Sequence, residues 1–404
     1  MRNPSIAKIL RAEDVARILN SNPFRLSIQA RRILWRKATC GVMAHHVIQD
    51  QGIAGVTIPT TTIGAYPKPA DAPIPMWSNM GKQRRAAPTL VYDALVEDRS
   101  AETKRTLDRM TMDAVREQVD CGITIPTDGE IRREHYVYYH CRHVQGIDFR
   151  HLSEQTMRDG SWVASVPTVI SKLEPGPAFL PADWRVAQSA TDREVKITVP
   201  GPLTISDTIA NDYYASRPEL ARALAEVLNI EIRRLAEAGC TWIQVDEPLF
   251  ARQVDEALAF GVECLERCFA GVGPGVNRAV HICCGYPACL DDPHPAKADP
   301  ASYFALSGAL DAADVDAVSI EDAHRPNDLK LLELFGHTTI ILGMIDIAKS
   351  HVESVDALRA RMGESLEHID ADRLIAAPDC GLALLPRRLA AAKLRNLATA
   401  AQSL

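Results

Sequence analysis

The sequence is poor in three features, each of which would indicate a particular class of protein. Only 5% of its 404 residues are aromatic, and acidic residues outnumber basic ones. No apolar run reaches the roughly 18 residues that span a bilayer. The net charge of −7 provides no basic surface to displace the counterions of nucleic acid. With 47% hydrophobic and 24% charged residues, we expect a globular protein that binds neither nucleic acid nor membranes.

The spacing of the cysteines and the composition of the first residues both argue against a secreted protein. Ten cysteines are scattered along the chain without the close spacing of a disulfide framework. Residues 1–10 lack the apolar core of a secretory signal. We therefore expect a cytoplasmic protein whose cysteines stay reduced.

Residues 1–50 differ from the rest of the chain in charge. They hold nine lysines and arginines against three acidic residues, and residues 11–19 have helical spacing. Such a basic arm could bind a membrane surface or an anionic partner, but we favour packing on the parent domain or on a subunit neighbour. We predict an extension over residues 1–50 and one domain over residues 51–404.

From residue 55 onward, short apolar runs alternate with helical stretches. The clearest helix is predicted over Glu219–Ala238, where apolar residues recur every three or four positions. Pro218 precedes it, Gly239 closes it, and a strand follows at once. This order of helix and strand is typical of a parallel sheet.

Eight short runs are predicted to be strands. They cover residues 57–63, 123–127, 195–199, 241–245, 280–283, 317–320, 339–342 and 374–377. Each is followed by polar, glycine or proline residues, as in a barrel whose active site is built from the loops at the carboxyl ends of its strands. We therefore predict an α/β fold, a (β/α)8 TIM barrel. The surplus run Trp162–Ile170 fits a β-hairpin inserted in one of its loops.

Several of these strand ends carry residues that bind soft or borderline metals. His281 and Cys283 lie two apart and can both face the barrel axis, while Glu321 and Cys380 follow other strands. A lone His-x-Cys pair is weak evidence, and it is the shared position at strand ends that indicates a site. One imidazole, two thiolates and one carboxylate suit a tetrahedral Zn²⁺ ion.

The motifs at the strand ends, taken together, resemble the catalytic barrel of cobalamin-independent methionine synthase. The resemblance covers about Val56–Leu404 and rests on seven segments in the right order: Thr62–Pro67, Asp128–Glu130, Gly201–Thr204, Gln244–Pro248, His281–Cys283, Ser319–Glu321 and Pro378–Gly381. It implies a zinc-dependent transfer of a methyl group to the sulfur of homocysteine. The chain is too short for the N-terminal half of the full-length enzymes, and is similar to the shorter, core-type relatives.

The resemblance also assigns the thiol substrate to particular residues. A zinc-bound thiol loses its proton and becomes the nucleophile. Asp246 and Glu130 match positions that hold the amine of homocysteine, with the backbone around Ile63 and Ala65 near its carboxylate. A loop-capping function is the alternative for the two acids. Ala65 stands where the family usually has serine.

The side of the site that would hold the methyl donor departs from the family. A histidine that is thought to help protonate the folate leaving group is replaced by Ala348, and His351 lies three residues further on. The tryptophan that stacks on folate is also missing, with Asp207 and Thr208 in that region. We therefore expect His351 to take a catalytic part, and leave open a donor other than polyglutamyl folate, either a small molecule or a protein-bound one.

Two other functions stay open at this point. A transferase resembling epoxyalkane:coenzyme M transferase would use a sulfonate-bearing thiol, which two carboxylates would repel. A non-catalytic zinc-binding barrel would have a closed metal site. A homo-oligomer or an accessory protein is compatible with the sequence.

Overall fold

The computed structural model describes residues 57–75, 89, 92–93, 101–157, 162–293 and 296–404. The basic extension predicted over residues 1–50 lies outside these ranges. No helix in the described ranges is long and apolar enough to cross a membrane.

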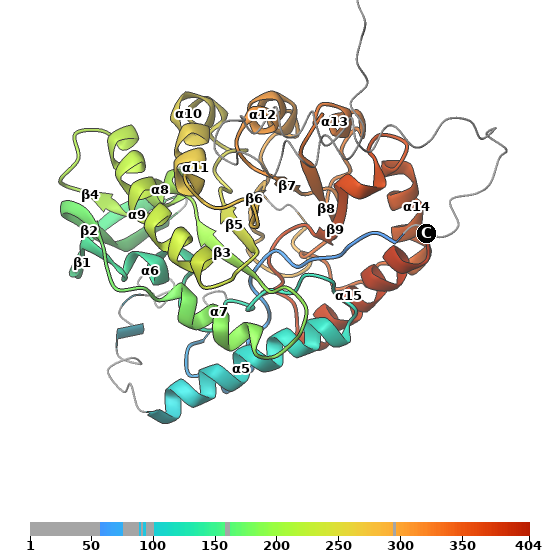
Figure 1. Ribbon diagram of the computed structural model, residues 1–404, viewed down its shortest axis with the longest axis horizontal. Coiled ribbons are helices and arrows are strands. Elements are labelled where there is room, and N and C mark those ends of the chain that lie inside the picture. The colour runs from blue at the N-terminus through green and yellow to red at the C-terminus, as the bar shows by residue number, and fades with distance from the viewer. Residues whose placement is uncertain (1–56, 76–88, 90–91, 94–100, 158–161, 294–295) are drawn as a thin grey trace, which may run out of the picture. The chain divides into compact units, whose positions relative to one another are not determined.

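Six parallel strands form the sheet at the centre of the fold (Figure 1). In order of pairing they are β3 (Lys196–Pro200), β5 (Trp242–Asp246), β6 (Asn277–Ile282), β7 (Ala317–Ile320), β8 (Thr339–Ile345) and β9 (Leu374–Pro378). Most of their residues are buried, as expected for parallel strands covered on both faces. All six overlap runs that the sequence predicts to be strands.

Two further extended segments close this sheet into a ring. Thr60 forms a parallel bridge with Ala376 of β9. At the other edge, Thr127 forms one with Lys196 of β3, and Thr61 bridges the two segments to each other. The predicted (β/α)8 barrel is therefore confirmed, with its first two strands present as short bridged segments.

A helix follows each of the eight strands. These helices are α5 (Ala101–Asp120), α7 (Leu180–Gln188), α9 (Arg217–Glu237), α11 (Val262–Phe269), α12 (Ala301–Ala312), α13 (Lys330–Glu333), α14 (Val355–Ser365) and α15 (Arg387–Gln402). Shorter helices in the loops are α6 (Tyr136–Cys141), α8 (Pro202–Thr208), α10 (Val254–Glu256), η2 (Ala257–Gly261) and η3 (Ala371–Arg373). Helices α5 and α15, from the two ends of the barrel sequence, contact each other (Figure 1).

Helix α9 shows how local sequence sets an element. Its N-cap is Ser216, whose side chain accepts a hydrogen bond from the backbone N–H of Glu219 at 3.3 Å. Pro218 stands in the first turn, where its missing N–H is not needed. The apolar stripe of the helix is buried. The predicted helix is confirmed and begins two residues earlier than expected.

A β-hairpin is inserted ahead of β3. Strands β1 (Val144–Met157) and β2 (Trp162–Pro175) pair antiparallel, and the two-residue strand β4 (Ala210–Asn211) adds to β2. The hairpin predicted from the run Trp162–Ile170 is confirmed. Its first arm, β1, has no comparable apolar run and therefore could not be predicted from the sequence.

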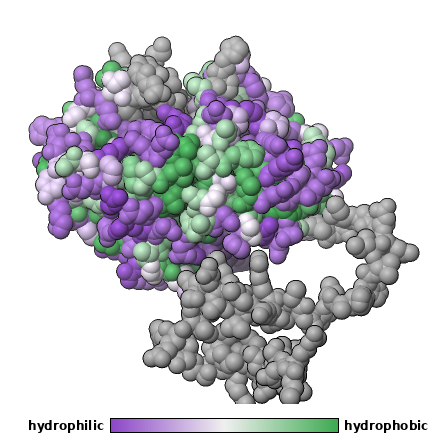
Figure 2. Space-filling view, turned by 90° about the horizontal axis from the view of Figure 1, so that it is seen from above, coloured by the Kyte–Doolittle hydropathy of each residue, from purple (hydrophilic) through white to green (hydrophobic). Residues whose placement is uncertain are grey.

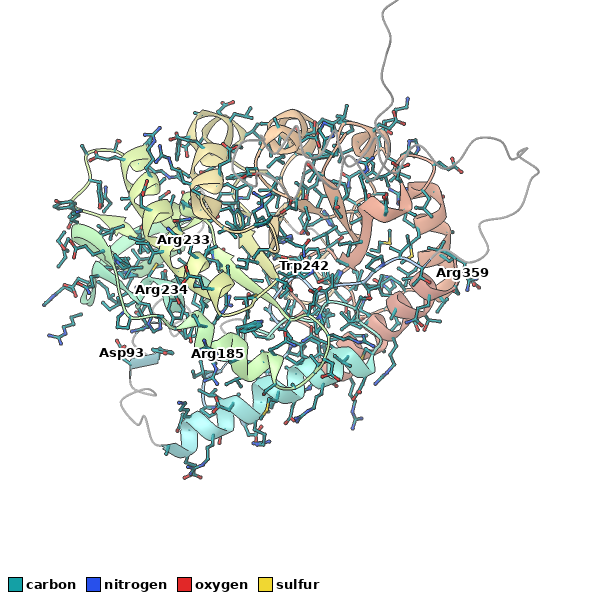
Figure 3. The ribbon with its side chains drawn as sticks, in the orientation of Figure 1. Asp93, Arg185, Arg233, Arg234, Trp242 and Arg359 are labelled. Atoms are coloured by element: carbon teal, nitrogen blue, oxygen red, sulfur yellow. The ribbon has the colours of Figure 1, made fainter. Side chains whose placement is uncertain are left out.

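The interior of the barrel changes in character along its axis. An apolar cluster fills part of it: Ile63, Ile125, Trp242, Ala279, Ala317, Ile341, Ile375 and Ala377. Trp242 lies in the middle of the ring of strands (Figure 3). Because side chains two apart on a strand face the same way, Gln244 and Asp246 follow Trp242 along the axis, and His281 follows Ala279. The interior therefore becomes polar towards the carboxyl ends of the strands.

The face seen in Figure 2 carries a band of hydrophobic residues between hydrophilic regions. That view looks down on the side where α10, α12 and α13 lie in a row in Figure 1. Exposed apolar side chains on this row include Leu258 of η2, Phe304 of α12 and Leu334 next to α13. Single exposed apolar side chains are ordinary on a protein surface, so we assign them no partner.

Gly343 of β8 provides a test of packing behind the site. A Cβ at this position would contact Asp379 Oδ1 and lie 2.8 Å from Asp379 Cα. We expect Gly343→Ala to lower the free energy of unfolding by about 3 kcal/mol, because backbone must move to make room. Chemical denaturation measures this. In the control Gly363→Ala, in α14, the new Cβ meets nothing within 4 Å and should stabilise the helix. Equal stability of the two variants would contradict the packing.

Candidate active site

The residues singled out from the sequence lie where the barrel strands end. Asp246 is the last residue of β5, and Cys283 directly follows β6. Glu321 directly follows β7, and Cys380 comes two residues after β9. Because all eight strands are parallel, these ends meet at one edge of the barrel. A cavity of about 250 Å³ opens there, lined by Glu130, Asp246, His281, Cys283 and Cys380, among others.

Three of the four predicted metal ligands form a compact cluster. The ligand atoms of His281, Cys283 and Cys380 all lie within 4.8 Å of one another. His281 and Cys283 are buried and Cys380 is partly exposed. Hydrogen bonding with Cys380 and burial raise the pKa of the Cys283 thiol. Two soft sulfurs and one imidazole at this spacing fit a metal ion of the zinc type.

Neighbouring groups fix the orientation of these ligands. His281 Nδ1 lies 2.9 Å from Ser319 Oγ, which leaves Nε2 directed at Cys380 Sγ, 3.4 Å away. The sulfur of Cys283 accepts a hydrogen bond from the backbone N–H of Gly285 at 3.2 Å. Partners of this kind hold a metal ligand in its binding orientation before the ion arrives.

Glu321, the fourth predicted ligand, lies outside the three-residue cluster. Its side chain is fully buried, and both carboxylate oxygens accept hydrogen bonds from Lys297 Nζ at 3.0 Å. His324 Nδ1 lies 3.4 Å from Oε2 of the same carboxylate. Lys297 could not be predicted from the sequence, because the loop that carries it has no periodic pattern.

Glu130 is held in place by one group from strand β3 and one from its own loop. Its Oε1 accepts hydrogen bonds from Thr198 Oγ1 at 2.8 Å and from Arg133 Nη1 at 3.2 Å. The residue has a φ of 55°, a left-handed conformation that turns the loop back into the cavity. A Cβ on Gly64 would lie 2.6 Å from Oε1, so glycine there makes room for the carboxylate.

Asp246 is buried in the wall of the same cavity. Its Oδ1 accepts a hydrogen bond from Gln244 Nε2 at 2.7 Å. Burial is the main reason that its pKa is raised to about 7, opposed by His281 and reinforced by the nearby charge of Glu130. The structure therefore brings both predicted acids to the cavity that the cysteines and the histidine line.

The two residues whose backbone was predicted to lie near the substrate carboxylate also line the cavity, but His351 does not. Ile63 and Ala65 line the cavity. His351, expected to take a catalytic part, is not among the lining residues; its side chain is 64% exposed, with Nε2 4.0 Å from Glu353 Oε1. The ring of His351 is therefore not part of the cavity lining, and its catalytic role stays a prediction.

Several residues that line the cavity were not singled out from the sequence. Arg133, His135 and Tyr136 lie three to six residues after Glu130. The run of charged and aromatic residues directly after a strand end is the signal in the sequence that indicates them. Tyr286 joins two loops: its hydroxyl donates to the carbonyl of Gly381 at 3.1 Å and accepts from the N–H of Leu384. Burial lowers the pKa of His135 to about 3, so its ring is neutral.

The fold and the site together define a class of protein. It is a closed parallel barrel with a buried His-Cys-Cys cluster and two carboxylates at the carboxyl edge, which is an arrangement suited to metal-assisted chemistry on a small molecule. Residues 58–403 match the family described as cobalamin-independent synthase, catalytic domain, and the chain belongs to this family.

Individual relatives agree with this assignment. A methionine synthase from Thermococcus kodakarensis is 30% identical over 342 residues, which cover 84% of this chain and 91% of the relative. The structure of a B12-independent methionine synthase from a Shewanella species, in complex with selenomethionine, is similar with a TM-score of 0.72 and 28% identity, covering 85% of this chain and 97% of the other. A structure from Listeria monocytogenes, with 16% identity and a TM-score of 0.62, supports the fold alone.

The raised pKa of Asp246 makes a prediction for the metal-free protein. The pKa lies near 7 when folded against 3.8 in its ordinary state, so ionising this carboxyl as the pH rises between those values opposes folding. We expect the free energy of unfolding of Asp246→Asn, relative to that of the unaltered protein, to rise by about 3 kcal/mol between pH 5 and pH 8, because the unfolded carboxyl is already ionised at pH 5 while the folded one ionises near pH 7.

Denaturation at the two pH values, with a chelator present, measures this difference. Asp192→Asn is the control, because Asp192 is exposed and should show no such dependence. A gain that is the same at both pH values would contradict the explanation by burial of charge.

Proposed function

We propose that this protein is a zinc-dependent methyltransferase that methylates the thiol of homocysteine to give methionine. The observation that carries the proposal is the cavity in which His281, Cys283 and Cys380 lie with Asp246 and Glu130. The names of the relatives, and the selenomethionine bound to one of them, agree with a product of this kind.

The metal would be held by His281, Cys283 and Cys380. Their donor atoms fit zinc in type and spacing, and Glu321, the fourth predicted ligand, would complete a tetrahedral set. When bound, zinc acts as a Lewis acid that lowers the pKa of a thiol, so that the thiolate is available as the nucleophile. The chain itself supplies the orientation of the ligands through Ser319 and Gly285.

The two acids would bind the ammonium group of homocysteine. Arg133 lies 3.2 Å from Glu130 and 3.7 Å from Asp128, so one guanidinium faces two carboxylates before Asp246 is counted. A substrate ammonium would give Glu130 and Asp246 a further cationic partner. An ammonium beside Asp246 also favours its ionised form, against the effect of burial.

The methyl donor would enter between the acids and the outer loops. Asp207, Thr208 and Arg252 line the same cavity, and the first two lie where the resemblance to folate-binding enzymes is lost. We propose a donor other than polyglutamyl folate, either a small molecule or one carried on a protein. Walls formed by Pro248 and Leu249 would keep water from the reacting sulfur.

Homocysteine binding tests the substrate. In the zinc-loaded protein we expect isothermal titration to show binding of homocysteine, weakened at least about tenfold by Asp246→Asn or Glu130→Gln, because each removes a partner of the ammonium. A matched thiol without an amine should bind the two variants no more weakly than the unaltered protein. If homocysteine does not bind, or if a sulfonate thiol binds better, the assigned substrate is wrong.

Metal binding tests the cluster. We expect Cys380→Ala to lower the affinity for zinc by at least about 100-fold, because it removes one of three soft ligands. Competition with a chromophoric chelator measures it. Cys289→Ala is the control, since Cys289 is exposed and lies outside the cluster. Equal zinc affinity of the two variants would exclude the cluster as the metal site.

A further inference from the structure

Lys297 and Glu321 form a buried ion pair beside the cysteines. Lys297 Nζ donates to both oxygens of the carboxylate at 3.0 Å, and the two side chains are 7% and 0% exposed. A lysine at this depth needs a fixed anionic partner, because an unpaired buried charge is costly. Each side chain therefore compensates the buried charge of the other.

The backbone around Lys297 is fixed to the loop that carries Cys283. The N–H of Ala298 donates to the carbonyl of Cys284 at 2.8 Å, and Arg325 donates to the carbonyl of Ala298 at 2.8 Å. Gly285 has a φ of 137°, and a Cβ there would lie 2.7 Å from the carbonyl oxygen of Ala296. These contacts set the ammonium next to Glu321.

The carboxylate of Glu321 thus has a place of its own outside the three-residue cluster. Besides Lys297, it lies near His324, whose Nδ1 is 3.0 Å from Asp379 Oδ2. Asp379 in turn accepts hydrogen bonds from the backbone N–H groups of residues 322–324 and directly precedes Cys380. The residues that hold Glu321 are therefore tied to the loop of a cysteine on the other side.

We propose that Lys297 is a positioning residue that holds Glu321 as a displaceable ligand. The ammonium would compete with a bound zinc ion for the carboxylate, so that an incoming thiol could take the place of Glu321. A carboxylate displaced into a buried site without such a partner would be an uncompensated charge. This inference rests on the proposed function, because it assumes that the cluster binds zinc and a thiol.

Metal affinity without any thiol is the first measurement. We expect Lys297→Met to bind Zn²⁺ about tenfold more tightly than the unaltered protein, because Glu321 loses its competing partner. The gain should be absent when Glu321→Gln is already present. Lys330→Met is the matched control at an exposed position and should change nothing. Equal affinity of Lys297→Met and the unaltered protein overturns the proposal, and so does a gain that persists with Glu321→Gln, since Lys297 would then act only as a nearby charge.

Thiol binding to the Co²⁺-loaded protein is the second measurement, followed by the thiolate absorption in the near ultraviolet. We expect Lys297→Met to need about tenfold more homocysteine for half saturation, and Lys297→Arg to restore binding in part. If Lys297→Met does not fold, Glu321→Gln is measured alone. It should bind homocysteine more tightly than the unaltered protein, because no carboxylate has to be displaced. An unchanged affinity overturns the proposal. If the unaltered protein binds neither metal nor thiol, the proposed function fails as well; if it binds both and the variants do not differ, only the inference about Lys297 fails.

Discussion

Closure of the barrel is the constraint on which the site depends. The first extended segment pairs with β9 through Thr60 and Ala376, near opposite ends of the described chain. This pairing brings the loop of Ala65 against the loop of Cys380: a Cβ on Gly381 would lie 3.1 Å from the Cβ of Ala65. Since the His-Cys-Cys cluster joins the end of β6 to the loop after β9, and the acids come from β5 and the loop after the second segment, no smaller part of the ring could assemble the cavity. The few hydrogen-bonded residues at the seam therefore determine whether the sulfur ligands and the acids face one another.

Several charged groups buried behind the cavity oppose folding, and the fold compensates each with a specific partner. Burial raises the pKa of Glu247 to about 7, yet its carboxylate accepts hydrogen bonds from the first turn of α8 at Leu203 and Thr204. Burial likewise lowers the pKa of Lys196 to about 7, and its ammonium donates to Gln244, which in turn donates to Asp246. Asp246 is thus held by a chain of polar groups that reaches down to the apolar layer around Trp242. A site that binds an ammonium, as we propose, needs this chain of polar groups, although apolar side chains in its place would make the barrel more stable.

The strands and helices could be predicted from repeating patterns in the sequence, whereas features that depend on a single long-range contact could not. Continuous apolar runs located every barrel strand, because a parallel strand is buried on both faces, and a period-3.6 pattern located α9. The alternation of side chains along an extended chain predicted that His281 and Cys283 face the same way. It could not show that Lys297 engages Glu321, since that contact depends on how one irregular loop folds back on the loop after β6. Closeness in sequence to Ala348 did not place His351 at the cavity, because its side chain is mostly exposed and is not among the lining residues.

The charges around the cavity determine which thiols suit it. Arg133 forms ion pairs with Glu130 and Asp128, and its guanidinium also donates to the hydroxyl and the backbone carbonyl of Thr198. A substrate with a thiol and an ammonium a few bonds apart, as proposed, would place its sulfur at the His-Cys-Cys cluster and its ammonium beside Asp246 and Glu130. A thiol that carries only a sulfonate would instead add negative charge beside these two acids, and the guanidinium that contacts Glu130 already faces a second carboxylate. The amine is therefore the group by which the two acids would favour the proposed thiol over a sulfonate thiol.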